Sequence, residues 1–146
     1  MLDCNPVGLP INAGTILRRE GELLSDGEKR GYQAMVGAIG YLMNCTRPDL
    51  AFVMSRLAQF ASCPTTAHMG AVKHVFRYIK GTVHAGLRIE GIDGHSSRVQ
   101  GYFDSAFADD PDDSRSTYGY TILYGNSTIL WKSKKHKGIS LSTTDA

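Results

Sequence analysis

The chain has 146 residues, of which 42% are hydrophobic and 21% charged, and its formal net charge is +2. These values are typical of one globular domain, or of the joined parts of two, and they exclude a disordered chain. So small a net charge does not by itself indicate a nucleic-acid-binding protein. The charges are nevertheless segregated, because no acid occurs between Asp49 and Glu90 and four lysines lie within residues 132–137.

The sequence carries no signal for membrane insertion or export. No apolar run approaches the ~20 residues that span a bilayer, and the N-terminus lacks a signal-peptide core. The three cysteines are widely spaced and odd in number, which fits neither a disulfide framework nor a zinc site. We therefore expect an intracellular protein of the cytoplasm or nucleus, with reduced thiols and no membrane partner.

Residues 1–27 are predicted to form an extended lead-in, because they contain prolines and no clean periodicity. Ser25 and Glu28 have the spacing of a capping box, which predicts that a helix follows. Apolar residues at helical spacing support it. Gly37 and Gly40 each cost about 1 kcal/mol relative to alanine inside a helix, so we expect both to mark close packing against another element.

Two further helices are predicted downstream. Pro48 suits a first helical turn, and an apolar stripe follows it. Pro64 breaks this helix, and a third helix carries its own stripe until Gly81, which we expect to be its C-cap. The two stripes consist of Leu50, Val53, Leu57 and Phe60, and of Met69, Val72, Phe76 and Ile79.

Three cations, Lys73, Arg77 and Lys80, lie on the third predicted helix at i, i+4 and i+7. This spacing puts them on one face, opposite the apolar stripe, where they can follow a phosphate backbone. A solvated helix face is the alternative interpretation. The lack of interleaved glutamate weakens that alternative, because ordinary solvent faces mix both signs of charge.

After Gly81 the apolar period changes to two, which predicts β-strands. We expect an antiparallel sheet of four strands, with a turn at residues 91–97 and a tight hairpin at Gly125 and Asn126. The second strand ends in Asp104 and lies in the middle of the sheet. The fold class is therefore α+β, with three helices followed by an antiparallel sheet. The four predicted strands are residues 86–90, 98–104, 117–124 and 128–134.

Carboxylates gather where the second predicted strand ends. Asp104 comes first, and a loop broken by Pro111 then carries four more, at Asp109, Asp110, Asp112 and Asp113. Mg²⁺ prefers carboxylate oxygens, so one interpretation is a hard-cation site. The alternative is a solvated acidic loop.

Several peptides resemble, in the same order, the polyprotein of copia-type LTR retrotransposons. Residues 101–110, GYFDSAFADD, and 115–120, RSTYGY, are similar to the start of that family's ribonuclease H domain. Upstream, residues 46–51, TRPDLA, and 77–82, RYIKGT, resemble the C-terminal part of its reverse transcriptase. With residues 131–135, WKSKK, the resemblance covers nearly the whole chain.

The resemblance implies a domain organisation and a set of functional residues. Residues 28–82 correspond to the helical, thumb- or connection-like end of reverse transcriptase, and residues 83–146 to a truncated ribonuclease H-like domain with an incomplete sheet. Asp104 matches the family's first catalytic acid, a Mg²⁺ ligand, and Asp110 is a second candidate ligand. The implied partner is nucleic acid, an RNA–DNA hybrid or a duplex bound weakly through Lys73, Arg77, Lys80, Lys132, Lys134 and Lys135.

Departures from the family's pattern lower the expectation of catalysis. Ala106 stands where the family has a second Asp, the polymerase's Tyr-Val-Asp-Asp peptide is absent, and the family's catalytic Glu would follow the last residue, Ala146. A two-metal hydrolase needs carboxylates from several elements to hold two ions ~4 Å apart. We therefore expect a polyprotein fragment that is inert alone, binds Mg²⁺ at most loosely and retains a hybrid-binding surface.

Two alternatives stay open. One is a repurposed, non-catalytic nucleic-acid-binding module that kept the basic helices. The other is a metal-dependent nuclease half-site that another chain, such as the rest of a Pol polyprotein, completes.

Overall fold

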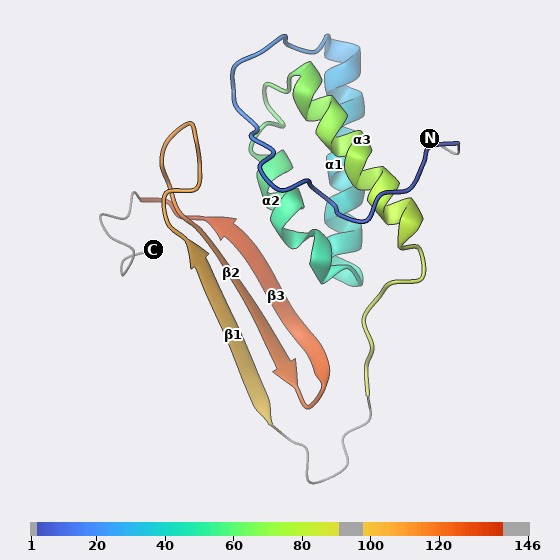
Figure 1. Ribbon diagram of the computed structural model, residues 1–146, viewed down its shortest axis with the longest axis vertical. Coiled ribbons are helices and arrows are strands. Elements are labelled where there is room, and N and C mark those ends of the chain that lie inside the picture. The colour runs from blue at the N-terminus through green and yellow to red at the C-terminus, as the bar shows by residue number, and fades with distance from the viewer. Residues whose placement is uncertain (1–2, 91–97, 139–146) are drawn as a thin grey trace.

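The computed structural model describes residues 3–90 and 98–138 (Figure 1). Three helices come first: α1 (Asp26–Cys45), α2 (Ala51–Ala58), which the 3-10 turn η1 (Pro48–Leu50) precedes, and α3 (Thr66–Gly81). Three antiparallel strands follow: β1 (Val99–Ala106), β2 (Thr117–Tyr124) and β3 (Ser127–Lys135). The order of helices and sheet confirms the predicted α+β class. No helix in these two ranges is long and apolar enough to cross a membrane.

Helix α1 begins where its capping box predicts. The Ser25 amide donates to Glu28 Oε2 at 3.0 Å, and the Glu28 amide donates to Ser25 Oγ at 3.5 Å. Two N–H groups of the first turn are thereby satisfied. Tyr32, Val36 and Ile39 then fall on one face, and all three are buried. Burial of each such side chain stabilises the fold by about 1.5–3 kcal/mol.

The two glycines of α1 lie in different environments. A Cβ atom on Gly40 would lie 3.0 Å from Cε of Met54, so α2 packs closely there, as predicted. A Cβ atom on Gly37 would meet nothing within 4 Å, so the expected close packing at that position is wrong. Gly40 is buried on the face toward α2, whereas Gly37 is exposed.

Arg47 organises the corner between α1 and η1. It is 4% exposed and donates twice to Asp49, from Nε to Oδ1 at 3.0 Å and from Nη2 to Oδ2 at 2.8 Å. Its Nη1 donates to the Thr82 carbonyl at 3.0 Å, and the Tyr78 hydroxyl donates to Asp49 Oδ2 at 2.8 Å. The network links the start of α2 to the end of α3.

Helix α3 does not end in the predicted glycine cap. Gly81 is the last helical residue, and the C-cap is Thr82, with a φ of −126°. Gly81 has a packing role instead, because a Cβ atom there would lie 3.0 Å from Cβ of Pro6. The small size of glycine, rather than its access to positive φ, therefore suits this position.

The hydrophobic core of the described residues lies within the helical half. Leu17 joins it from the N-terminal segment and is 4% exposed, so the predicted lead-in is partly packed. The Leu24 amide donates to the Pro64 carbonyl at 3.0 Å, and an antiparallel bridge joins Leu23 to Thr65, which attaches the segment to the start of α3. The other core residues are Tyr32, Val36, Ile39, Leu50, Val53, Leu57, Phe60, Val72 and Val75.

The sheet differs from the prediction in strand number. Its described strands run in the order β1-β2-β3, and residues 86–90 are not a strand. Glu90 instead contacts side chains of the β2–β3 hairpin. Its main-chain amide donates to Ser127 Oγ at 2.9 Å, and Asn126 Nδ2 donates to its Oε2 at 3.1 Å. Asp104 therefore lies on an edge strand and not on a middle strand, within the part of the chain described. The turn predicted at residues 91–97 lies outside the described residues.

The predicted hairpin between β2 and β3 is confirmed. Tyr124 pairs with Ser127, and Gly125 adopts a φ of +60°. This left-handed conformation carries no steric cost for glycine, which is why the turn forms at this residue.

The sheet attaches to the helices through β3. Trp131 Nε1 donates to the Met43 carbonyl at 2.9 Å, and Lys135 Nζ donates to Gln59 Oε1 at 3.4 Å. Figure 1 shows β3 beside α2, with β1 at the far edge of the sheet. Because side chains alternate between the two faces of a strand, Trp131 and Lys135 define the helix-facing side of the sheet.

Candidate functional site

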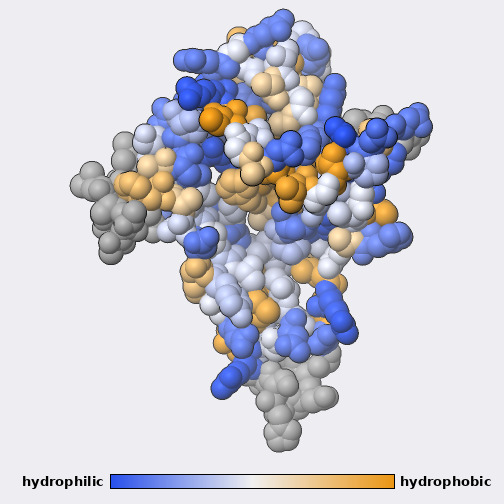
Figure 2. Space-filling view, viewed as in Figure 1, coloured by the Kyte–Doolittle hydropathy of each residue, from blue (hydrophilic) through white to orange (hydrophobic). Residues whose placement is uncertain are grey.

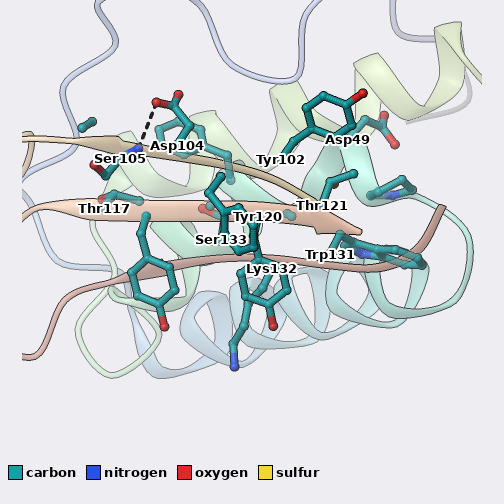
Figure 3. Close-up of a pocket in the computed structure, with 17 residues that line it drawn as sticks. Asp49, Tyr102, Asp104, Ser105, Thr117, Tyr120, Thr121, Trp131, Lys132 and Ser133 are labelled. Carbon is teal, nitrogen blue, oxygen red and sulfur yellow. Dashed lines mark hydrogen bonds between the residues drawn. The ribbon is translucent and has the colours of Figure 1, made fainter. Parts of the chain in front are cut away.

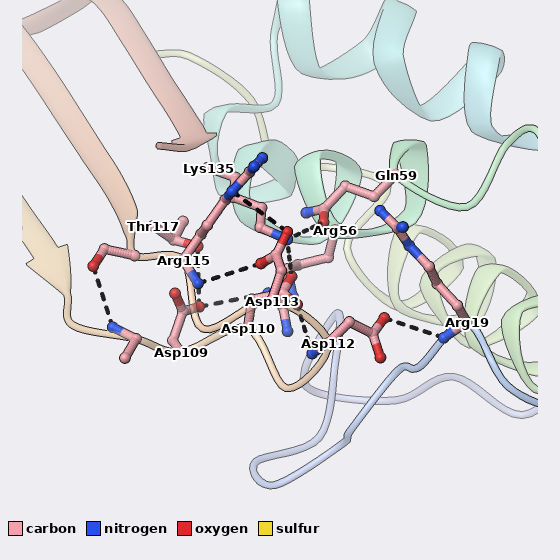
Figure 4. Close-up of polar contacts among 12 residues, drawn as sticks. Arg19, Arg56, Gln59, Asp109, Asp110, Asp112, Asp113, Arg115, Thr117 and Lys135 are labelled. Carbon is pink, nitrogen blue, oxygen red and sulfur yellow. Dashed lines mark hydrogen bonds and ion pairs between the residues drawn. The ribbon is translucent and has the colours of Figure 1, made fainter. Parts of the chain in front are cut away.

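The acidic loop between β1 and β2 folds onto the helices around two cations (Figure 4). Asp110 is 4% exposed, and its Oδ2 lies 3.2 Å from Arg56 Nη1 and 2.6 Å from Lys135 Nζ. Lys135 Nζ also lies 2.7 Å from Asp113 Oδ1, and Asp109 Oδ2 lies 3.6 Å from Arg56 Nη1. These five residues form an ion cluster that joins α2, the loop and β3.

Neutral hydrogen-bond donors also contact the carboxylates of the loop. The Asp112 amide donates to Asp110 Oδ1 at 2.9 Å, and Thr117 Oγ1 donates to Asp109 Oδ2 at 3.0 Å. The Arg19 amide donates to Asp112 Oδ2 at 3.1 Å, which ties the loop to the N-terminal segment. The interpretation as a solvated acidic loop is therefore wrong for Asp110, whose carboxylate is buried and paired.

The surroundings of Asp110 keep its carboxylate ionised. Burial raises the pKa of this group, but the hydrogen bonds from Lys135 and the Asp112 amide, with the charges of Lys135 and Arg56, outweigh burial. The net pKa is therefore below the ordinary value for aspartate.

Arg56 is the residue of this cluster that the sequence analysis missed. It is 8% exposed and lies on the buried face of α2 between Val53 and Leu57. Its position three residues after Val53 and four before Phe60 belongs to the apolar stripe, where helical spacing favours an apolar side chain. A cation at such a position needs a buried anion, because an unpaired charge is costly to dehydrate. An arginine within the apolar stripe therefore indicates a buried carboxylate partner.

Asp104 is not a member of the ion cluster. It is exposed on β1, where it pairs with Gly119 and accepts a hydrogen bond from the Ser105 amide at 2.9 Å. Within residues 3–90 and 98–138, no three His, Cys, Asp or Glu side chains lie where they could share a metal ion. The described residues therefore do not fit a two-metal centre, in which several carboxylates surround the ions.

A groove of about 420 Å³ runs beside Asp104 (Figure 3). It is lined by Phe52 of α2, by Tyr102 and Asp104 of β1 and by Trp131 of β3, among others. Aromatic rings thus form much of its wall, and Asp104 supplies the carboxylate from the sheet.

The three cations of α3 are not equivalent. Lys73 is exposed. Arg77 Nε donates to the Asn5 carbonyl at 2.7 Å, and Lys80 Nζ donates to the Cys4 carbonyl at 2.9 Å. Arg77 and Lys80 therefore hold the N-terminal segment along α3, a role that the sequence analysis missed.

The N-terminal segment leaves apolar surface exposed where it crosses the helices. His74 Nε2 forms a third contact with it, to the Leu9 carbonyl at 3.0 Å. Leu9 and Ile16 remain 57% and 62% exposed. Figure 2 shows hydrophobic surface gathered in the middle of this face of the molecule, where the segment crosses the helices in Figure 1.

The alternation of β3 divides the lysine cluster. Lys132 and Lys134 are exposed on the side of the sheet away from α2. The side chain of Lys135 points to the opposite side, is 14% exposed and pairs with Asp110 and Asp113. Contact of Lys135 with nucleic acid therefore stays a prediction. Such a contact would compete with the ion pairs to Asp110 and Asp113.

No family model and no solved structure gives a significant match to the chain. Curated proteins do match. The whole chain is 37% identical, over 147 residues, to the "Retrovirus-related Pol polyprotein from transposon RE2" of Arabidopsis thaliana. It is 34% identical, over 152 residues, to the corresponding polyprotein from transposon TNT 1-94 of Nicotiana tabacum.

The chain spans about a tenth of the length of these two polyproteins, 10% and 11% respectively. A shorter relative is the "Secreted RxLR effector protein 161" of Plasmopara viticola, which is 41% identical over 114 residues. That match covers 78% of this chain and 79% of the relative.

Proposed function

We propose that the chain belongs to the family of retrovirus-related Pol polyproteins from transposons, as the segment in which reverse transcriptase ends and ribonuclease H begins. The peptides at residues 46–51, 77–82 and 101–120 support this assignment and a copia-type origin. The change from helices to an antiparallel sheet between Gly81 and Val99 agrees with such a boundary.

We infer that this chain alone does not cleave nucleic acid. Asp104 is exposed and forms no group of three candidate metal ligands with other described residues, and the carboxylates of the ion cluster are already held by Arg56 and Lys135. In a two-metal hydrolase, the ions activate the attacking water and stabilise the charge that develops on the phosphate. Asp104 would be one ligand of such an ion, and Asp110 would have to exchange its present cations for it.

The activity of the chain is tested with a labelled RNA–DNA hybrid in Mg²⁺ or Mn²⁺. The expected result is no cleavage of the RNA strand. Cleavage that disappears in Asp104→Asn would contradict the proposal and would favour a functional metal site completed by other groups.

We further propose that α3 provides a weak, sequence-independent surface for a hybrid duplex. The observation that carries this proposal is the charge of α3, whose 16 residues include Lys73, Arg77 and Lys80 and no acid. Arg77 and Lys80 donate to main-chain carbonyls, which are neutral acceptors, so these bonds do not cancel their charge. Cations on one helix face attract phosphates without reading the bases.

The binding test measures the affinity for a fluorescent hybrid across a range of salt. Each lost phosphate contact should lower the slope of log affinity against log salt by about one unit. We therefore expect a shallower slope in the triple variant Lys73→Gln, Arg77→Gln, Lys80→Gln. Glutamine removes the charge and can still donate to the carbonyls of the N-terminal segment, so the segment should stay in place.

Arg30→Gln is the matched control, because Arg30 is an exposed cation on α1. Its slope should stay within a few tenths of a unit of the unmodified chain. An unchanged slope in the triple variant would assign the α3 cations to an ordinary solvated face.

A further inference from the structure

The sheet has a second side, opposite Trp131 and Lys135, which we call the open face. Residues paired across neighbouring strands share a face, and alternate residues of one strand share it too. The register pairs Phe103 with Tyr120 and Tyr120 with Lys132. The open face therefore carries one row of Phe103, Tyr120 and Lys132, and the next row contains Ser105, Tyr118 and Lys134.

Of the aromatic rings on this face, Phe103 is exposed, and Tyr118 and Tyr120 are half-buried. Phe103 is 75% exposed, and its ring centroid lies 6.1 Å from that of Tyr120, with the planes inclined by 40°. Tyr118 is held edge-on by His136, with centroids 4.8 Å apart. Tyr118 and Tyr120 are two residues apart on one strand, roughly 7 Å along it.

The charge of the open face is positive. Lys132 and Lys134 are exposed beside the tyrosines, and none of the strand residues that share the open face is an acid. Asp104 projects from the opposite side. Figure 3 shows Tyr120 and Lys132 pointing away from the side on which Asp104 and Tyr102 lie.

We propose that the open face binds single-stranded nucleic acid, with bases stacked on Phe103 and Tyr120 and phosphates paired with Lys132 and Lys134. Unstacked bases present flat apolar faces that aromatic side chains cover without regard to sequence, and lysines beside the rings meet the backbone. A duplex does not fit this surface, because its bases already stack on one another. This surface shares no residue with the cations of α3, so the inference stands independently of hybrid binding by that helix.

The test uses fluorescence anisotropy with the full chain and two probes, oligo(dT) and oligo(U). Phe103→Ala should weaken binding roughly tenfold, because loss of one stacking ring typically has an effect of that order. Phe103→Trp should preserve binding, and Phe103→Leu should not restore it, because leucine retains apolar area without a ring. Replacement of Lys132 and Lys134 by Gln should lower the salt slope by about 0.7 for each phosphate contact.

Tyr102→Ala is the matched control, because Tyr102 precedes Phe103 on the same strand, is 61% exposed and faces the other side. The affinity of Tyr102→Ala for the probes should stay within about twofold of that of the unmodified chain. The melting temperatures of Tyr102→Ala and Phe103→Ala should match. An abasic oligonucleotide of equal length should bind Phe103→Ala and the unmodified chain alike.

Three outcomes would overturn the proposal. Equal affinity of Phe103→Ala and the unmodified chain for oligo(dT) and oligo(U) would exclude stacking. Abasic and base-containing probes of equal affinity would reduce the surface to a charged patch. Concentration-dependent self-association that Phe103→Ala abolishes, with no binding of single strands, would make the face a contact between two copies. Loss of hybrid binding in the α3 variant, with single-strand binding intact, concerns the other proposal alone.

Discussion

At the residue scale, the molecule places two opposite charges in its interior. Arg56 and Asp110 are 8% and 4% exposed and lie 3.2 Å apart at their closest charged atoms. Dehydration of an ion costs several kcal/mol, which a well-formed pair largely offsets without adding much net stability. The pair therefore specifies where the acidic loop sits on α2, and loss of either member leaves a buried charge without its partner.

Asp110→Asn should lower the free energy of unfolding by about 3 kcal/mol, because Arg56 and Lys135 then lose their buried carboxylate. Urea denaturation followed by circular dichroism measures the change. Asp104→Asn is the control, since Asp104 is exposed, and its effect should stay within about 0.5 kcal/mol. Equal destabilisation in the two variants would contradict a structural role of the ion cluster.

His68 is a second buried titratable residue, with 0% of its surface exposed. Its ring stacks on Phe60 with centroids 3.9 Å apart, and its Nδ1 accepts a hydrogen bond from the Thr65 amide at 2.9 Å. Burial lowers the pKa of His68, because dehydration disfavours the charged ring. The neutral imidazole is thus part of the N-terminal cap of α3.

The free energy of unfolding should decrease as the pH falls below about 6.5, the ordinary pKa of histidine. The unfolded chain binds a proton there and the folded chain binds it only at lower pH, so this contribution is complete above 6.5 and declines below it. His68→Gln, which keeps a capping-box residue at the third helical position, should remove this part of the pH dependence. Exposed His84→Gln should retain it. A pH profile in His68→Gln that matches the unmodified chain would show that another group titrates.

At the element scale, local signals predicted the helices better than the strands. The Ser25 capping box and the apolar stripes depend on neighbours within one or two turns, and the structure has all three helices near their predicted places. The alternation at residues 86–90 looked equally local, but a strand exists only if a partner edge accepts it, and Glu90 contacts the hairpin instead. Helix formation could therefore be predicted from the sequence, and strand pairing only in part.

The ion cluster was less predictable for the same reason. Asp110 and Arg56 are 54 residues apart in the sequence, so no local pattern connects them. The sequence identified the acids and offered either a metal site or solvent, and the partners turned out to be cations from α2 and β3. The alternation of side chains along β3 does predict one part of the cluster, because it places Lys135 on the face opposite Lys132 and Lys134.

The glycines of α1 test packing within one element. Gly37→Ala should stabilise the protein by up to about 1 kcal/mol, because alanine favours helix and the new Cβ atom meets nothing within 4 Å. Gly40→Ala should gain less or lose stability, because its Cβ atom would lie 3.0 Å from Cε of Met54. Thermal unfolding of the two variants provides the comparison. A greater gain from Gly40→Ala would mean that Met54 moves aside without cost.

At the scale of the whole molecule, stability is distributed unevenly between the two halves. Every buried hydrophobic residue that the structure describes lies between Leu17 and Val75, in the helical half. The buried residues of the loop and sheet, among those described, are polar: Asp110, Ser116, Thr117 and Ser127. The sheet therefore depends on its attachment to the helices, since burial of apolar surface is the main favourable term in folding.

A fragment of residues 1–85 should retain helical circular dichroism and unfold cooperatively, whereas a fragment of residues 98–138 should be unfolded alone. An isolated sheet of this size with no apolar core cannot offset the conformational entropy of its chain. Circular dichroism and limited proteolysis of the two fragments measure this. A folded sheet fragment would contradict the dependence on α2 and β3 contacts.

The hydrogen bond between the Arg19 amide and Asp112 joins residues 93 positions apart, and the bond from Trp131 to Met43 spans 88. Closing such long loops lowers the chain entropy before the contact can stabilise the fold. Contacts within and between neighbouring helices, by contrast, form quickly. On the ribosome, residues 26–81 are also complete before β1 has been synthesised. The order of synthesis and the order of folding therefore coincide, and the bond between Arg19 and Asp112 closes late, because Asp112 is synthesised 93 residues after Arg19.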